Sequence, residues 1–208
     1  MDHLTTEEQQ VEAIKKFWKE NGTAIVLGAV LGFGGLWGWR YYNAEQIAAQ
    51  EQASDSYEVA VQALGRDQAA FTSAKSFVND NPDSSYAVMA AFRLAKEAVS
   101  RGDFSEAEKQ LSWITKSAQA PAVLKDVANL RLARVQAESE KYTDALASLG
   151  NIVSASYKTQ VEEVKGDIYQ RQGMLEEAKK AYSAALEGDE TNNLVQMKLD
   201  DLASQKQG

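Results

Sequence analysis

The strongest hydrophobic feature of the chain is an uncharged run from Thr23 to Trp39, with polar segments on both sides. At about 1.5 Å per helical residue, a helix from Asn21 to Tyr42 would be about 33 Å long, close to a hydrocarbon core of about 30 Å. The pattern therefore predicts one transmembrane helix, which we bound at residues 23–42.

Charged and aromatic residues at the two ends of the run predict its orientation. The nearest basic residues before it are lysines, whereas Arg40 at its exit is followed by no basic residue until Arg66. Positive charge in short loops favours the cytoplasmic side, so residues 1–22 are predicted to be cytoplasmic and the larger C-terminal part to lie outside. Aromatic rings gather at the exit, where a headgroup layer suits them. The lysines are Lys15, Lys16 and Lys19, and the rings are Trp37, Trp39, Tyr41 and Tyr42.

Three other interpretations of the run compete with a transmembrane helix. A cleaved signal peptide would need small residues soon after the run, but Arg40 and two tyrosines follow it. A buried core helix would accommodate the glycines of the run. A lipid anchor has no cysteine to use, and Asp2 stands where myristoylation requires glycine.

Glycines within the run predict a surface for helix packing. Gly28, Gly32 and Gly35 fall on one helical face, where small residues let a second helix approach closely. Because glycine is common in membrane helices generally, the pattern is equally consistent with the absence of a specific helix partner.

The segments on either side of the run are predicted to be helical. Apolar residues recur at helical spacing from Val11 to Trp18, and Asn21-Gly22 predicts the end of that amphipathic helix. We interpret residues 1–22 as an interfacial lead-in to the span, with a docking or regulatory tail as the alternative. Residues 43–64, rich in alanine and glutamine, are predicted to form a helical connector.

A short phrase recurs through residues 65–208. It reads large apolar, spacer, acid, alanine, and its alanines are 38 and then 33 residues apart. A further small residue lies twelve positions before each alanine, which lets two antiparallel helices cross closely. This is the spacing of a tetratricopeptide repeat. The phrases are Phe104–Ala107, Tyr142–Ala145 and Leu175–Ala178, and the earlier small residues are Ala95, Ala133 and Gly166.

The predicted fold is all-α, with a tetratricopeptide-like solenoid after the transmembrane helix. An extra hairpin before Ser85 gives about three to four hairpins, and the segment from Glu190 to Gln205 is predicted to cap the open end. A generic helical bundle would share the helical periodicity. The repeated phrase at near-constant spacing favours the solenoid.

Composition narrows the function. The chain has no cysteine, which excludes thiolate chemistry, and its net charge of -8 argues against nucleic acid as a partner. His3 is the only histidine and is predicted to be cytoplasmic, so the outer domain cannot assemble a Ser/His/Asp triad. Phosphate-loop and dinucleotide-binding motifs are absent from the sequence, and no cofactor, metal or catalytic residue is predicted. A non-enzymatic role is favoured over a cell-envelope enzyme that uses paired carboxylates.

Several segments resemble the bacterial YfgM family, the ancillary subunits of the SecYEG translocon. They are Gln10-Val11-Glu12-Ala13, Glu20-Asn21-Gly22, Gly38-Trp39-Arg40-Tyr41-Tyr42, Leu130-Arg131-Leu132-Ala133-Arg134-Val135-Gln136 and Met197-Lys198-Leu199. The resemblance implies an inner membrane protein with one span, a cytoplasmic N-terminus and a periplasmic tetratricopeptide-like domain.

The resemblance also implies partners. These are the SecYEG translocon and the membrane-anchored periplasmic chaperone PpiD, with emerging polypeptides handed toward soluble periplasmic chaperones. An alternative implied by the same resemblance is a regulatory role of the cytoplasmic tail on the stress-response regulator RcsB.

A partner-binding groove is predicted on the concave face of the stack, which the first helix of each repeat would line. Mapping the repeat onto the chain places seven residues near it, of which three would otherwise pack between repeats. The seven are Met89, Phe92, Lys96, Leu130, Arg134, Asp167 and Gln170, and the three are Met89, Phe92 and Leu130.

Overall fold

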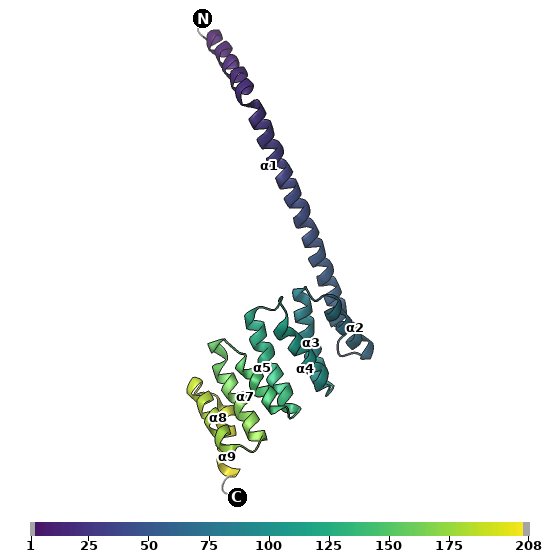
Figure 1. Ribbon diagram of the computed structural model, residues 1–208, viewed down its shortest axis with the longest axis vertical. Coiled ribbons are helices and arrows are strands. Elements are labelled where there is room, and N and C mark those ends of the chain that lie inside the picture. Colours follow the sequence, from purple (N-terminus) through teal and green to yellow (C-terminus); the bar gives the residue numbers. More distant parts are fainter. Residues whose placement is uncertain (1–2, 206–208) are drawn as a thin grey trace. The chain divides into compact units, whose positions relative to one another are not determined.

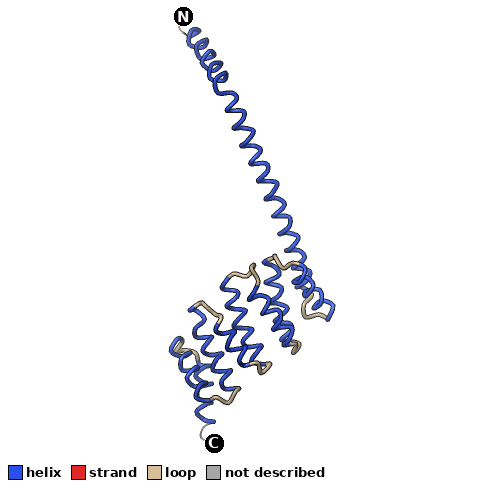
Figure 2. Tube along the Cα trace, in the orientation of Figure 1, coloured by secondary structure: helices blue, strands red, loops and turns tan. Residues whose placement is uncertain are grey.

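The computed structural model describes residues 3–205, and every regular element within them is a helix (Figure 1; Figure 2). The chain divides into two compact units, Met1–Gln52 and Ala53–Gly208. In chain order the elements are α1 (His3–Gln62), α2 (Gln68–Asp80), α3 (Ser85–Ser100), α4 (Phe104–Lys116), α5 (Ala122–Glu138), α6 (Tyr142–Gly150), the 3-10 turn η1 (Ala155–Tyr157), α7 (Lys158–Arg171), α8 (Leu175–Gly188) and α9 (Asn193–Gln205).

Helix α1 does not stop at Asn21-Gly22, so the predicted helix end there is wrong. A glycine ends a helix when it adopts a left-handed conformation, and Gly22 has no positive φ. The Asn21 side-chain amide instead donates to the Phe17 carbonyl within the helix, at 3.1 Å. Helix α1 therefore runs without interruption from residue 3 to residue 62. It passes through the tail, the span and the connector that were predicted at residues 1–22, 23–42 and 43–64.

The apolar part of α1 has the length and composition to cross a membrane. Only 6 % of this apolar stretch is buried, whereas a core helix would be mostly buried. A Cβ added at Gly28, Gly32 or Gly35 would meet nothing within 4 Å. The predicted helix-packing role of these glycines stays a prediction.

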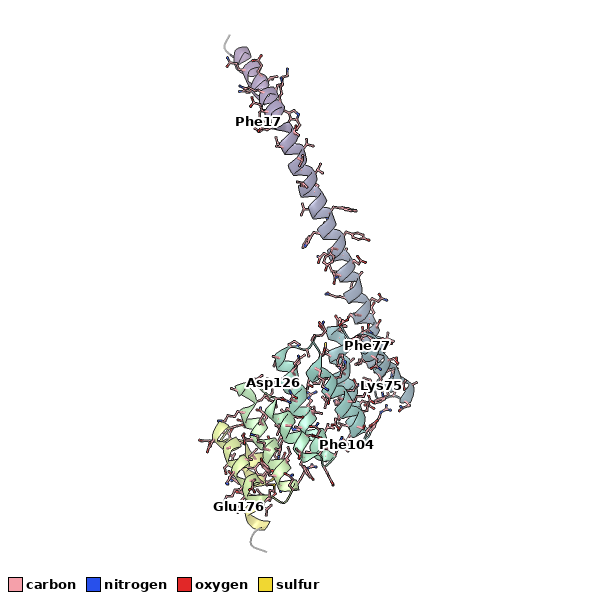
Figure 3. The ribbon with its side chains drawn as sticks, viewed as in Figure 1. Phe17, Lys75, Phe77, Phe104, Asp126 and Glu176 are labelled. Carbon is pink, nitrogen blue, oxygen red and sulfur yellow. The ribbon has the colours of Figure 1, made fainter. Side chains whose placement is uncertain are left out.

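The remaining helices form a stack of antiparallel hairpins, as predicted. The hairpins are α3/α4, α5/α6 and α7/α8, with α9 packed on α8 at the C-terminal end. The end of α1 supplies the extra first helix, because Tyr57 packs against Phe77 of α2, labelled in Figure 3, with ring centroids 6.2 Å apart. The core consists of three successive buried clusters along the stack.

The turn within each hairpin has a residue with left-handed backbone conformation at the same position of the repeat. Gly102 and Gly173 have φ of 75° and 74°, each five residues before the alanine of the repeated phrase. In the middle hairpin Glu140 takes the same position with φ 59°. The repeat therefore fixes the turn geometry even where the residue is not glycine.

Helices α7 and α8 cross closely at Gly166. A Cβ added at Gly166 would lie 2.3 Å from Cε1 of Tyr182, whose side chain is fully buried. The ring therefore occupies the space that any side chain at position 166 would need.

Replacing Gly166 with alanine is expected to lower the free energy of unfolding by about 1–3 kcal/mol, because the buried ring of Tyr182 would have to move. Urea unfolding of the detergent-solubilised chain, followed by circular dichroism, measures the change. Gly150→Ala is the matched control, since a Cβ there meets nothing within 4 Å. Equal loss of stability in the two variants would contradict the close crossing.

Candidate functional site

A groove of about 400 Å³ lies between the first helices of the first two repeats, α3 and α5, and the end of α1. Its walls are mostly apolar, with two arginines among them. We call it the α3–α5 groove. It is lined by Tyr57, Met89, Phe92, Arg93, Leu124, Val127 and Arg131.

Helical spacing explains why these side chains meet. On α3 the lining residues recur at three and four positions, and on α5 they recur at three and four positions from Leu124. The opposite face of α3 packs into the core, where Leu94 is fully buried. Each helix thus divides into a buried face and a face that the groove leaves accessible.

Aromatic contacts hold the walls in place. The rings of Tyr57 and Tyr86 lie 5.5 Å apart between centroids. The guanidinium carbon of Arg131 lies 5.1 Å from the centroid of the Phe92 ring, a cation–π contact that joins α5 to α3. The second contact places the Arg131 guanidinium over the ring of Phe92, another lining residue of the groove.

Two of the predicted groove residues line this groove, and two more lie one turn beyond it. Met89, 49 % exposed, and Phe92 are lining residues. Lys96 and Arg134 are exposed and follow Arg93 and Arg131 by three residues, on the same sides of their helices.

Leu130 lies elsewhere. It is 7 % exposed and belongs to the buried cluster that also contains Val164 and Ile168 of α7. Of the two interpretations, packing between repeats describes its place in the structure. A partner could not contact this side chain without opening the core.

Asp167 and Gln170 are engaged by the C-terminal end of the stack. The Tyr182 hydroxyl lies within hydrogen-bonding distance of both, at 2.7 Å from Asp167 and 2.9 Å from Gln170. The Lys198 ammonium donates to Asp167 at 2.7 Å and to Glu163 at 2.9 Å. These contacts attach α8 and α9 to α7, so the structure does not bring Asp167 and Gln170 together with the α3–α5 groove.

The surroundings in this polar cluster raise the pKa of both Lys198 and Tyr182. Burial alone would lower the pKa of Lys198, but the hydrogen bonds to Asp167 and Glu163 outweigh it and raise the pKa above 10.5. Burial, reinforced by Asp167, raises the pKa of the Tyr182 hydroxyl. Lys198 and Tyr182 therefore remain donors at neutral pH.

Sequence reasoning missed the two arginines of the groove. Arg93 follows the predicted Met89 by four residues, and Arg131 precedes the predicted Arg134 by three, so helical periodicity from a predicted groove residue could have found them. Among residues whose side chains the structure describes, no group of three or more His, Cys, Asp or Glu side chains could hold a metal ion.

Comparison with known proteins adds to this geometry. A family model described as a tetratricopeptide repeat-like domain matches residues 15–204. The chain is similar to proteins named "Ancillary SecYEG translocon subunit" from Escherichia coli (strain K12), Haemophilus influenzae and Aggregatibacter actinomycetemcomitans. Identities are 32 % over 207 residues, 32 % over 205 and 36 % over 208. The alignments cover 98 %, 97 % and 97 % of this chain and all of each relative. The predicted tetratricopeptide-like fold is confirmed.

Substituting methionine for Lys198 is expected to lower the free energy of unfolding by about 1 kcal/mol, because its charged hydrogen bonds to α7 are lost. Since the folded-state pKa of Lys198 is raised, this stabilisation is present below pH 10.5 and is lost as the pH rises through the raised value. The difference between the original chain and the variant should therefore shrink at strongly alkaline pH.

Urea unfolding at several pH values measures that difference. Lys180→Met, at an exposed position of α8, is the control and should change stability little. If the difference in the free energy of unfolding between the original chain and Lys198→Met stays constant through alkaline pH, packing and not charge is responsible for the stabilisation.

Proposed function

Because the chain belongs to the family of ancillary SecYEG translocon subunits, we propose that it is a membrane-tethered adaptor that associates with the SecYEG translocon at the bacterial inner membrane. The adaptor helps pass emerging polypeptides to periplasmic chaperones, including a PpiD-like membrane-anchored chaperone. It performs no chemistry of its own.

The observation that carries this proposal is the accessible α3–α5 groove on a stack of repeats, in a chain whose α1 could cross a membrane. Repeat stacks of this kind use extended surfaces to bind other proteins. The α3–α5 groove, of about 400 Å³, favours brief contacts with a bound polypeptide that must be released again.

A membrane helix adds what a small groove lacks. Confinement to the same bilayer as the translocon raises the effective concentration of the groove near emerging chains, without any new contact. We therefore assign residues 23–42 of α1 to the span and the helical stack of residues 65–208 to partner binding.

The charge pattern supports a cytoplasmic N-terminus and a periplasmic stack. Lys15, Lys16 and Lys19 lie before the apolar run, and Arg40 alone lies close behind it. Since the chain has no cysteine, a single introduced cysteine can report the side of the membrane without background.

Ser105→Cys, at an exposed position of α4, is expected to react with a membrane-impermeant maleimide in cells whose outer membrane alone has been opened. Glu12→Cys, at an exposed position of α1, should react only after the inner membrane is also opened. The reverse labelling pattern would contradict the proposed orientation.

Photoreactive residues placed at Met89 and Val127 are expected to crosslink to translocon subunits, a PpiD-like chaperone or emerging secretory chains in intact cells. These positions line the groove, whereas Lys179 on α8 is an exposed control position outside it. Mass spectrometry of the captured products identifies them.

Crosslinks that arise equally from all three positions would argue against the groove as the contact surface. Capture of none of the expected partners from these positions, with crosslinks to a cytoplasmic regulator from a further photoreactive residue at Glu12 in the predicted tail of residues 1–22, would favour the regulatory alternative.

A further inference from the structure

Positive charge is concentrated around the α3–α5 groove, although the chain as a whole is acidic, with a net charge of -8. Arg93 and Arg131 line the groove, and Lys96 and Arg134 are exposed one turn further along. None of these four side chains forms an ion pair with another residue in the described part of the chain. Four cations therefore face solvent on two adjacent helices.

The acidic residues of the same two helices are committed to other contacts. Glu97 of α3 pairs with Arg101 at 2.8 Å, and Glu138 of α5 pairs with Arg171. Asp126 of α5, labelled in Figure 3, is buried and accepts hydrogen bonds from the backbone of residues 153 and 154. The surplus positive charge is thus not neutralised by acids on its own helices.

The next repeat carries negative charge in the corresponding region. On α7 the corresponding region carries Glu163 and Asp167, which bind Lys198 of α9. The positive surface therefore ends with α5, and it coincides with the part of the stack that has the apolar groove. Charge and apolar surface together define one region.

A complementary occupant must supply apolar side chains as well as negative charge. Its walls include Met89, which is 49 % exposed, and the side chains of Leu124 and Val127. A volume of about 400 Å³ is at the small end of ligand pockets. It suits one or two large side chains.

We infer that the α3–α5 groove binds a partner segment in which acidic side chains stand next to large apolar ones. The apolar side chains enter between Met89 and Val127, and the carboxylates pair with Arg93 and Arg131. An arginine fork holds a carboxylate by two parallel hydrogen bonds, which gives direction as well as attraction. This inference rests on the proposed adaptor function for the partner being a protein, and it adds the chemistry that the groove selects.

The test uses the full chain in phosphatidylcholine nanodiscs and a short fluorescent peptide of alternating leucine and glutamate. We expect saturable binding by fluorescence anisotropy that weakens as sodium chloride is raised. Peptides with lysine in place of glutamate, or with serine in place of leucine, should bind at least about tenfold more weakly.

Two pairs of substitutions locate the binding surface. Arg93→Gln with Arg131→Gln should weaken binding at least about tenfold. Lys96→Gln with Arg134→Gln removes the same charge without touching the Phe92 contact, and should weaken binding several-fold. Lys179→Gln with Lys180→Gln, on α8, is the charge-matched control and should leave binding unchanged. Circular dichroism confirms that each variant is folded.

Other results would overturn the inference. Absence of peptide binding, or equal weakening by the α8 control, would show that the groove does not select this chemistry. Binding of phosphatidylglycerol vesicles, lost in the Arg93 and Arg131 variant while the peptide binds no more tightly than its lysine version, would identify a lipid surface. Concentration-dependent self-association lost in the same variant, again without selective peptide binding, would identify a second copy of the chain.

Failure of this inference is distinguishable from failure of the adaptor proposal. If the peptide does not bind but crosslinks from the groove still capture translocon partners, the chemistry of the occupant is wrong and the adaptor stands. If the peptide binds but no such partner is captured in cells, the groove chemistry stands and the adaptor proposal fails.

Discussion

Close helix crossing at small residues is the constraint on which the stack depends. Ala107, Ala145 and Ala178 are completely buried, one in each hairpin, and Gly166 lies directly against the ring of Tyr182. A larger side chain at any of these points would separate the two helices. The spacing of the hairpins, and with it the distance between neighbouring first helices, follows from these contacts.

That spacing produces the groove. Because the small residues face inward, the larger side chains of α3 and α5 on the other side meet across the gap between repeats, as the contact of Phe92 with Arg131 shows. At α7 the corresponding side chains are used differently. There, Lys198 of the last helix reaches Asp167 and Glu163, so this part of the stack uses its polar side chains to hold its own end in place.

The hairpins could be predicted from sequence because their signal is local and repeated. A phrase of four residues and a small residue twelve positions earlier define the two helices and the turn between them, and even Glu140 follows the left-handed geometry set by the repeat. The continuation of α1 through Asn21-Gly22 could not be predicted in this way. Asn21-Gly22 has the composition of a helix end, but a glycine ends a helix only if its backbone turns left-handed.

The groove was only partly predictable for a related reason. Repeat positions indicate which side chains point toward the concave face, and Met89 and Phe92 lie there. They do not indicate which of those side chains another helix will engage, as happens to Asp167, or which will be buried by the next repeat, as happens to Leu130. Such contacts depend on residues far along the chain.

A small, charged groove and a membrane tether complement each other physically. Exposed arginines attract an acidic segment over distances of about a Debye length, near 8 Å at physiological ionic strength, and so increase the rate of encounter more than the lifetime of the complex. A groove of about 400 Å³ buries too little apolar surface to retain a polypeptide for long. For the proposed adaptor, a partner in the same membrane would be encountered often, so frequent encounters would replace tight binding and the bound segment could be released to the next protein.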